Sequence, residues 1–261
     1  MENSQNTEQK KVEEGTSLNF LKVDKLKQKS HALFCLLKTD DIIVALNKIP
    51  FKGSQKIFNQ KLKEEDNKIL TIYRKGSFFN IKVMGPLGIK LEESNLENLD
   101  DLNKKTNDYL KSIESFDNYR DFEVFRGRKH KYNVLEVNEA SLLASLLPFV
   151  WFIHHRLYVP LFLLGCTLIL LGSIAWWLFL AAWIIITIYM SKSSMSLLRG
   201  YNLLNEMKIY MKLYAPGAKN VQEIVRNVDK KSNFIFPLVE PIDPEEKELQ
   251  LEKEDPQALP T

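Results

Sequence analysis

The chain has 261 residues, of which 26% are charged and 45% are hydrophobic. Its 36 Lys and Arg against 33 Asp and Glu give a formal net charge of +3, which argues against a strongly cationic nucleic-acid-binding protein. This composition is that of an ordinary globular protein. However, residues 157–190 form a run without one charged side chain. The run indicates a membrane segment, so the average composition is misleading.

The N-terminal residues 1–17, MENSQNTEQKKVEEGTS, are polar and mixed in charge. They lack the apolar core of a signal peptide, so we expect a disordered lead. Cys35 and Cys166 are the two cysteines, and only the second lies in the charge-free run, so no disulfide framework is expected. The four histidines have no metal-ligand spacing, and neither a metal nor a cofactor is predicted.

Residues 18–93 alternate short apolar runs with turn signals, which predicts a small α+β domain. Helices are expected where apolar side chains recur at helical spacing after a serine that can cap the first turn. Strands are expected where apolar runs are short or alternate with polar residues. The predicted strands are 18–23, 42–46, 69–73, 79–83 and a further strand from 89, and the predicted helices are 30–36 and 54–63.

The order of these elements resembles a PDZ domain. The segment KTDDIIVALNKIPF (38–51) looks like the stretch of bacterial PDZ domains in which Gly-Asp precedes a buried strand and Asn-Gly follows it. The preceding SHALFCLL resembles the short helix of that family. Here Asp40-Asp41 replaces Gly-Asp and Asn47-Lys48 replaces Asn-Gly, so both turns must be built differently.

The segment GPLGI (85–89) resembles the loop with which PDZ domains bind a peptide's C-terminal carboxylate. Its position after the last hairpin strand implies a circularly permuted PDZ-like fold. The resemblance then implies that backbone N–H groups of Leu87, Gly88 and Ile89 bind the carboxylate, while the peptide adds a strand beside residues 89–92. The alternative is a plain Pro-Gly turn without a ligand.

A charged connector, 94–131, follows. Residues 97–113 have a weak helical apolar face, which fits a packed helix or a spacer equally well. Arg126, Arg128, Lys129 and Lys131 place four positive charges within six residues. They fit either a solvated loop or contact with anionic lipid headgroups, worth about 1 kcal/mol per charge near such a surface. Aromatic residues are sparse among them, so no nucleic acid is expected.

The charge-free run is too long for one span. A single helix over it would be about 51 Å long, whereas the hydrocarbon core is about 30 Å thick. We therefore expect an α-helical transmembrane hairpin of helices 157–171 and 175–190, turning near Gly172 and Ser173. Lys and Arg occur in both flanks but not in the turn, which predicts two spans with both termini cytoplasmic. A bacterial inner membrane is the expected location.

The predicted membrane domain covers 132–231 and includes two flanking helices. An interfacial or re-entrant helix is expected over 139–153, with a kink at Pro148. An amphipathic helix is expected over 202–214, with Leu203, Met207, Tyr210, Met211 and Tyr214 on one face. Residues 132–218 resemble a small bacterial membrane-domain family of unknown function, through Tyr132-Asn133-Val134, residues 142–161 and Arg199-Gly200-Tyr201. The Pro-rich acidic segment 232–261 is expected to be disordered.

No catalytic set, phosphate-binding loop or zinc motif is recognisable, so an enzyme is not expected. The expected function is a membrane-anchored peptide- or protein-binding scaffold with a PDZ-like groove in the cytoplasm. The alternative is a small oligomeric transporter or channel component. The spans contain only Thr167, Ser173 and Thr187 as polar side chains, which disfavours that alternative. A homo-oligomer formed through the hairpin is compatible with either function.

Overall fold

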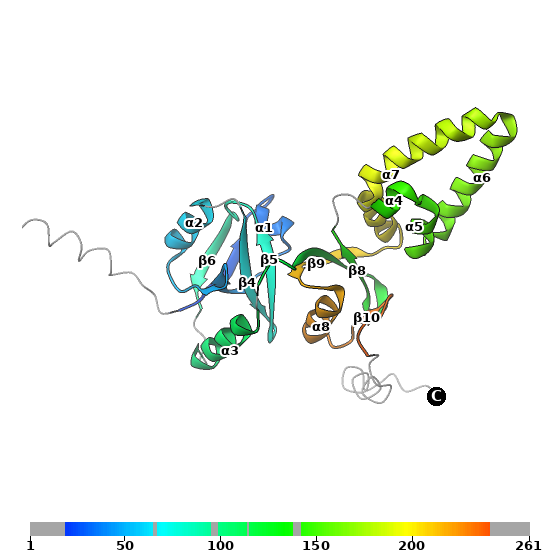
Figure 1. Cartoon of the computed structure of the whole chain (residues 1–261). Helices are drawn as coiled ribbons and strands as arrows, with labels where there is room; N and C mark the ends of the chain where they lie inside the picture. The colour runs from blue at the N-terminus through cyan, green and yellow to red at the C-terminus, as the bar shows by residue number, and fades with distance from the viewer. Residues whose placement is uncertain (1–18, 65–66, 95–98, 114, 138–141, 241–261) are drawn as a thin grey trace, which may run out of the picture. The chain divides into compact units, whose positions relative to one another are not determined.

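A computed structural model of the chain describes residues 19–64, 67–94, 99–113, 115–137 and 142–240 (Figure 1). The chain divides into two compact units: unit 1 comprises Met1–Glu136 and Ile209–Thr261, and unit 2 comprises Val137–Lys208. The predicted lead 1–17 and most of the predicted acidic tail lie outside the described residues. The fold is therefore a mixed α+β unit interrupted by a helical insertion.

Unit 1 is built on one large sheet (Figure 1). Its strand order is β10-β8-β7-β9-β5-β4-β2-β1-β6, and β3 pairs with β2 off this path. The neighbouring pairs with a recorded register are antiparallel, except β10 with β8, which is parallel. The strands are β1 (Leu21–Leu26), β2 (Ile42–Leu46), β3 (Ile49–Pro50), β4 (Lys68–Arg74), β5 (Ser77–Val83), β6 (Ile89–Glu93), β7 (Arg120–Arg126), β8 (Lys131–Glu136), β9 (Lys208–Ala215) and β10 (Asn233–Phe234).

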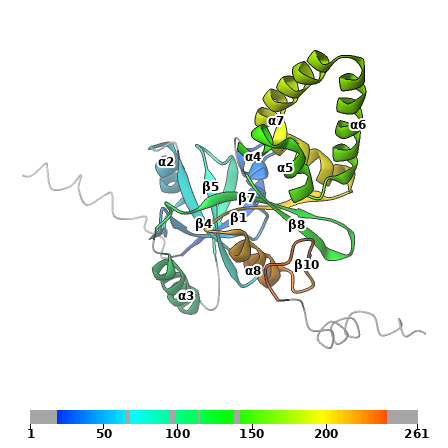
Figure 2. The same ribbon diagram turned by 45° about the vertical axis from the view of Figure 1, so that its right-hand side comes forward.

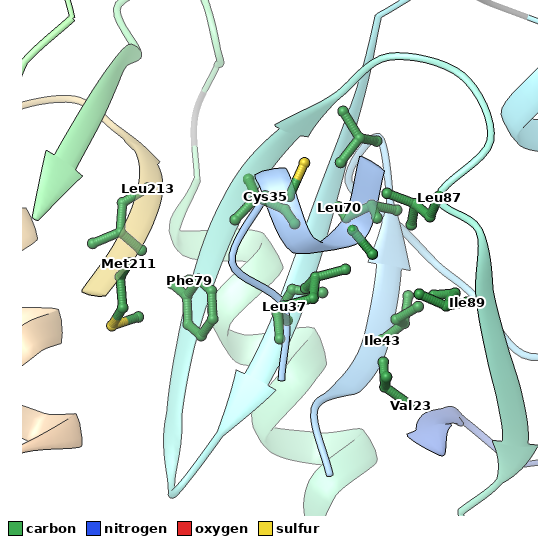
Figure 3. Close-up of a cluster of buried hydrophobic side chains, with 14 of the residues drawn as sticks. Val23, Cys35, Leu37, Ile43, Leu70, Phe79, Leu87, Ile89, Met211 and Leu213 are labelled. Atoms are coloured by element: carbon green, nitrogen blue, oxygen red, sulfur yellow. The ribbon is translucent and has the colours of Figure 1, made fainter. Parts of the chain in front are cut away.

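Helices α1 (His31–Phe34), α2 (Gln55–Glu64), α3 (Leu99–Ser112) and α8 (Ala218–Val228) belong to unit 1. The strands and helices expected between residues 18 and 93 are present, each within a few residues of its predicted bounds. Periodicity succeeds here because β2 is buried along its whole length and β5 alternates around a buried centre. The side chains of these strands meet in one core, part of which Figure 3 shows.

The predicted amphipathic helix 202–214 is wrong. Helix α7 ends at Leu204, Glu206 takes a left-handed φ of 58°, and strand β9 then begins at Lys208. Met211, Leu213 and Ala215 alternate into the core, and each is at most 2% exposed. The apolar residues of this segment fit both a helical and an alternating period, and pairing with distant strands decides for the alternating one.

The boundaries predicted for the membrane domain, 132–231, are also wrong. Strand β8, most of β9 and all of α8 belong to unit 1, and their core residues join the cluster formed by β1 to β6. The predicted connector 94–131 contributes α3 and β7 to the same unit. The predicted tail begins too early as well, since β10 pairs with β8 and Phe234 is 6% exposed. These assignments depend on pairings between residues about a hundred positions apart, which local patterns do not show.

Unit 2 consists of helices α4 (Leu142–Leu146), α5 (Pro148–His154), α6 (Tyr158–Ile174) and α7 (Trp176–Leu204). Pro148 divides the predicted helix 139–153 into α4 and α5, because proline cannot donate the backbone hydrogen bond that a continuous helix needs. The first residues of that prediction lie outside the described part. Helices α6 and α7 form a hairpin, as both ribbon views show (Figure 2). Ala175 lies between the two helices.

Candidate peptide-binding edge

Strand β6 ends the sheet of unit 1. It pairs with β1 along one side, from Leu21 opposite Glu93 to Leu26 opposite Ile89, and the described part of the chain places no strand along its other side. An edge strand presents unpaired backbone N–H and C=O groups that another chain can pair with. The free edge of β6 is the side on which strand addition beside residues 89–92 is predicted.

The side-chain amide of Gln55, the first residue of α2, occupies this edge. Its Nε2 donates to the carbonyl oxygen of Ile89 at 2.9 Å, and its Oε1 accepts from the N–H of Leu91 at 3.3 Å. One side chain thus supplies a donor and an acceptor to residues i and i+2 of the edge, as a peptide group of an added strand would. The hydrogen bonds of these two edge groups are thus made by one side chain, which a ligand could displace.

A second glutamine makes the same contact with an extended segment of the chain. Gln222 on α8 donates to the carbonyl oxygen of Phe236 at 2.7 Å and accepts from the N–H of Leu238 at 2.8 Å. Gln222 is 3% exposed, whereas Gln55 is only half-buried. The Gln222 contact is therefore sealed from water, while the Gln55 contact can exchange with a competing ligand.

The loop before β6 is hydrogen-bonded to unit 1 through its carbonyl groups. The carbonyl oxygen of Leu87 accepts from the N–H of Ala32 at 3.0 Å, and that of Gly88 accepts from Lys27 at 3.4 Å. Within the described parts of the chain, the N–H groups of Leu87 and Gly88 have no acceptor. Gly88 has a φ of 66°, and a Cβ there would lie 3.0 Å from the Cβ of Ser30. Only glycine combines this backbone with this close approach.

The three predicted carboxylate-binding residues are brought together, but only their backbone faces the edge. The side chain of Leu87 is 0% exposed and that of Ile89 is 5% exposed. Both lie with Val23, Ile43 and Leu70 in the core cluster (Figure 3). Any ligand recognition by these residues would use main-chain groups, as strand addition requires.

A buried ion pair supports the turn before β2. The guanidinium of Arg74 makes a two-pronged contact with the carboxylate of Asp41, at 2.6 and 2.7 Å, and it also donates to the carbonyl oxygen of Leu36 at 3.1 Å. Asp41 belongs to the PDZ-like stretch, but nothing local in the sequence indicated Arg74 as its partner. Asp40, Asn47 and Lys48 adopt φ angles of 71°, 47° and 69° at the two turns that flank β2. The turns keep the left-handed backbone without the glycines that favour it.

The predicted basic cluster is divided by the structure. Arg128, Lys129 and Lys131 are exposed at the β7–β8 turn. Arg126 instead contacts two aromatic rings, with its Cζ 5.4 Å from the ring centre of Tyr210 and 5.9 Å from that of Tyr132.

Sequence reasoning missed the polar cluster beside Arg126. The carboxylate of Asp229 lies 2.8 Å from Nδ1 of His130 and accepts from the hydroxyl of Tyr132 at 2.6 Å. Burial alone would raise the pKa of Asp229, but the hydrogen bonds from Tyr132 and His130 outweigh it and leave that pKa lowered. Lys38 lies 4.0 Å from the ring centre of Tyr210, and burial with the nearby Arg74 lowers its pKa to about 8. No short motif could reveal a cluster whose members lie so far apart in the chain.

The apolar helices of unit 2 expose much of their surface. Phe162, Ile169, Ile174 and Trp176 are each more than 70% exposed. In the described part of the chain only α7 is both long and apolar enough to cross a membrane, and α6 is shorter. The hydroxyls of Thr167 and Ser173 donate to carbonyls of their own helix at 2.8 Å. These two hydroxyls therefore give no sign of a polar pathway.

The comparisons with known proteins return no assignment. No family model matches the chain, and no relative was found among curated proteins. Among the described residues, no group of three or more His, Cys, Asp or Glu side chains is arranged to hold a metal ion. The candidate site therefore rests on its own geometry.

Proposed function

We propose that this protein is a membrane-anchored peptide-binding module that captures an extended peptide segment on the free edge of β6. The observation that carries the proposal is the Gln55 amide, which satisfies the carbonyl of Ile89 and the N–H of Leu91 in place of a strand. A peptide would displace this amide and pair with the same two groups. Its C-terminal carboxylate would meet the N–H groups of Leu87, Gly88 and Ile89, in line with the PDZ resemblance.

The anchor in this proposal is the α6–α7 hairpin. Helix α6 spans about 25 Å and the charge-free part of α7 about 24 Å at 1.5 Å per residue, which suits two short spans with local thinning of the bilayer. Arg156 and Lys192 flank the apolar stretch, whereas its turn has no Lys or Arg. This distribution supports a cytoplasmic location for both termini in a bacterial inner membrane. Anchoring would concentrate the captured partner at the membrane.

Peptide capture is tested with the full chain in lipid nanodiscs and a library of ten-residue peptides that end in a free carboxylate. The strongest binder is then compared with its C-terminal amide and with a version N-methylated at alternate residues. We expect both changes to weaken binding by about tenfold or more, because each removes hydrogen bonds that the edge requires. Equal binding of all three peptides would contradict strand addition.

The Gln55→Ala variant tests whether the Gln55 amide competes with the peptide for the edge of β6. Removing the amide should strengthen binding of the selected peptide several-fold, because no internal contact then has to be broken. Gln60→Ala, on an exposed position of the same helix, serves as the matched control and should leave affinity unchanged. Weaker binding by the Gln55 variant would show that this side chain contacts the ligand instead of competing with it.

Topology is tested separately in sealed vesicles. Single cysteines are placed in a cysteine-free chain at Ser4, at Ser173 and at the exposed position Lys230, and they are labelled with an impermeant maleimide. We expect residues 4 and 230 to react from one side and residue 173 from the other. Labels at the two ends on opposite sides would exclude the hairpin without affecting the peptide assay.

A further inference from the structure

Unit 1 contains a cavity of about 440 Å³ at the meeting point of α3, the β4–β5 turn, β9 and the exposed face of α8. This volume lies within the range of sites for small molecules or for one bound side chain, about 300–1,000 Å³. The cavity lies outside the β6 edge, and none of its lining residues belongs to the proposed peptide site. It requires a separate explanation.

One wall of the cavity is aromatic. Phe78, Tyr109, Tyr119 and Tyr214 all line it. The rings of Phe78 and Tyr109 are stacked with centres 5.1 Å apart, and those of Tyr119 and Tyr214 are 5.5 Å apart. The hydroxyl of Tyr109 accepts from Asn80 at 3.1 Å, and that of Tyr214 donates to the carbonyl of Phe116 at 3.3 Å. These contacts hold the wall in place before any ligand arrives.

The facing wall is a polar stripe on α8. Asn220, Glu223 and Asn227 recur at spacings of three and four residues, so they lie on one side of the helix. Val221 and Val225 face the core on another side, and each is 0% exposed. The three polar residues are exposed, and none of them has a hydrogen bond or ion pair with a described residue. Their polar atoms are free to meet a ligand.

The charge of the lining has one sign. Among the described residues that line the cavity, Glu223 is the only acidic side chain, and no Lys, Arg or His is found. The faces of aromatic rings attract cations through the ring quadrupole, and a nearby carboxylate adds to that attraction. A cation is therefore attracted by both the rings and the carboxylate, whereas an anion would be repelled by the carboxylate.

We propose that this cavity binds an organic cation, an alkylated ammonium group, with Glu223 as its counter-ion and the three tyrosines as its wall. Aromatic residues with a carboxylate suit such a group because it is both bulky and positively charged, and it is weakly hydrated. The expected ligand is a free small molecule that carries such a group, and choline is its simplest probe.

The test uses the full chain in nanodiscs of phosphatidylglycerol, which contain no choline. Choline is titrated by calorimetry, and 3,3-dimethylbutan-1-ol serves as its neutral isostere, with empty nanodiscs as the blank. We expect choline to bind and the neutral isostere to bind about tenfold more weakly or not at all. Equal binding of choline and its isostere, or absence of choline binding, would overturn the proposal.

Two variants locate the site. Glu223→Gln and Tyr119→Leu should each weaken choline binding by about tenfold, whereas Glu64→Gln, an exposed carboxylate at the end of α2, should leave it unchanged. Thermal unfolding of the Glu223 variant should match the parent chain, because this side chain has no internal partner among the described residues. Choline binding that survives both cavity variants would place the cation elsewhere and contradict the proposal.

Discussion

The two units of this chain use apolar side chains in opposite ways. In unit 1 they meet across a sheet whose strands come from both ends of the chain, and residues such as Val23, Leu70 and Val225 are fully buried together. In unit 2 the helices α6 and α7 contact each other locally and leave residues such as Ile169 and Ile174 exposed. The stability of unit 1 therefore depends on long-range packing. That of unit 2 depends on helix formation and, as we propose, on lipid.

This difference can be followed experimentally because all four tryptophans, Trp151, Trp176, Trp177 and Trp183, lie in unit 2. Tryptophan emission therefore reports on unit 2, while the loss of strand signal in circular dichroism reports on unit 1. Each prediction below is expected to change the second signal and leave the first in place. A variant that changes both equally would show that the two units unfold as one.

The largest expected effect comes from the ion pair between Asp41 and Arg74. Asp41→Asn should lower the free energy of unfolding of unit 1 by about 3–5 kcal/mol, because it leaves a buried guanidinium without its counter-charge. Denaturant titration followed by circular dichroism measures this loss. The double variant Asp41→Asn with Arg74→Met should recover part of it. If the single variant were as stable as the parent, the pair would have no structural role.

Leu213→Ala distinguishes strand β9 from the helix that periodicity predicted. In the strand Leu213 is 2% exposed, so the truncation should cost about 2–4 kcal/mol. In the predicted helix Leu213 lies off the apolar face, and its loss would have little effect. The same denaturant titration decides between these outcomes, and Lys208→Ala, at the exposed start of β9, is the control.

Lys48→Gly should stabilise unit 1 by about 1 kcal/mol. Lys48 has a φ of 69°, a conformation that costs an ordinary residue roughly 1–2 kcal/mol and costs glycine little. The gain is read as a rise in the midpoint of thermal unfolding. Gln60→Gly, in the middle of α2, should instead lower the midpoint, since glycine weakens a helix. A fall for both variants would show that the turn is not strained.

The smallest effect concerns Lys38 and pH. Its pKa in the folded protein, about 8, lies below the ordinary value of 10.5, so the unfolded chain holds this proton more tightly between those two pH values. The charged Lys38 therefore lowers the free energy of unfolding by its full amount below pH 8. The free energy of unfolding rises as the pH increases from 8 toward 10.5. Lys38→Met should remove that dependence and add less than about 1 kcal/mol at pH 7, because the side chain is partly exposed. Parallel pH curves for the two chains would contradict this account.

Local sequence patterns predicted the elements of residues 18–93 and the division of the apolar run into two helices. They failed at β9, where apolar residues fit two periods, and at α4–α5, where Pro148 breaks a run predicted to be one kinked helix. For the candidate site, the loop 85–88 was found from its glycines, but Gln55 was not. A glutamine in the first turn of a helix carries no signal that its amide will reach a strand 34 residues later.

The sequence by itself determined the properties that depend on neighbours in the chain: the charge-free stretch, the alternation of β5, the short helices and the glycine loop. Tertiary structure alone decided which strands pair, which of the four basic residues contacts aromatic rings, and which side chains enclose the cavity on α8. The physical reason is that periodicity and charge-free length are properties of residues that follow one another in the chain. Register, burial and counter-charge are settled by groups that only folding brings together.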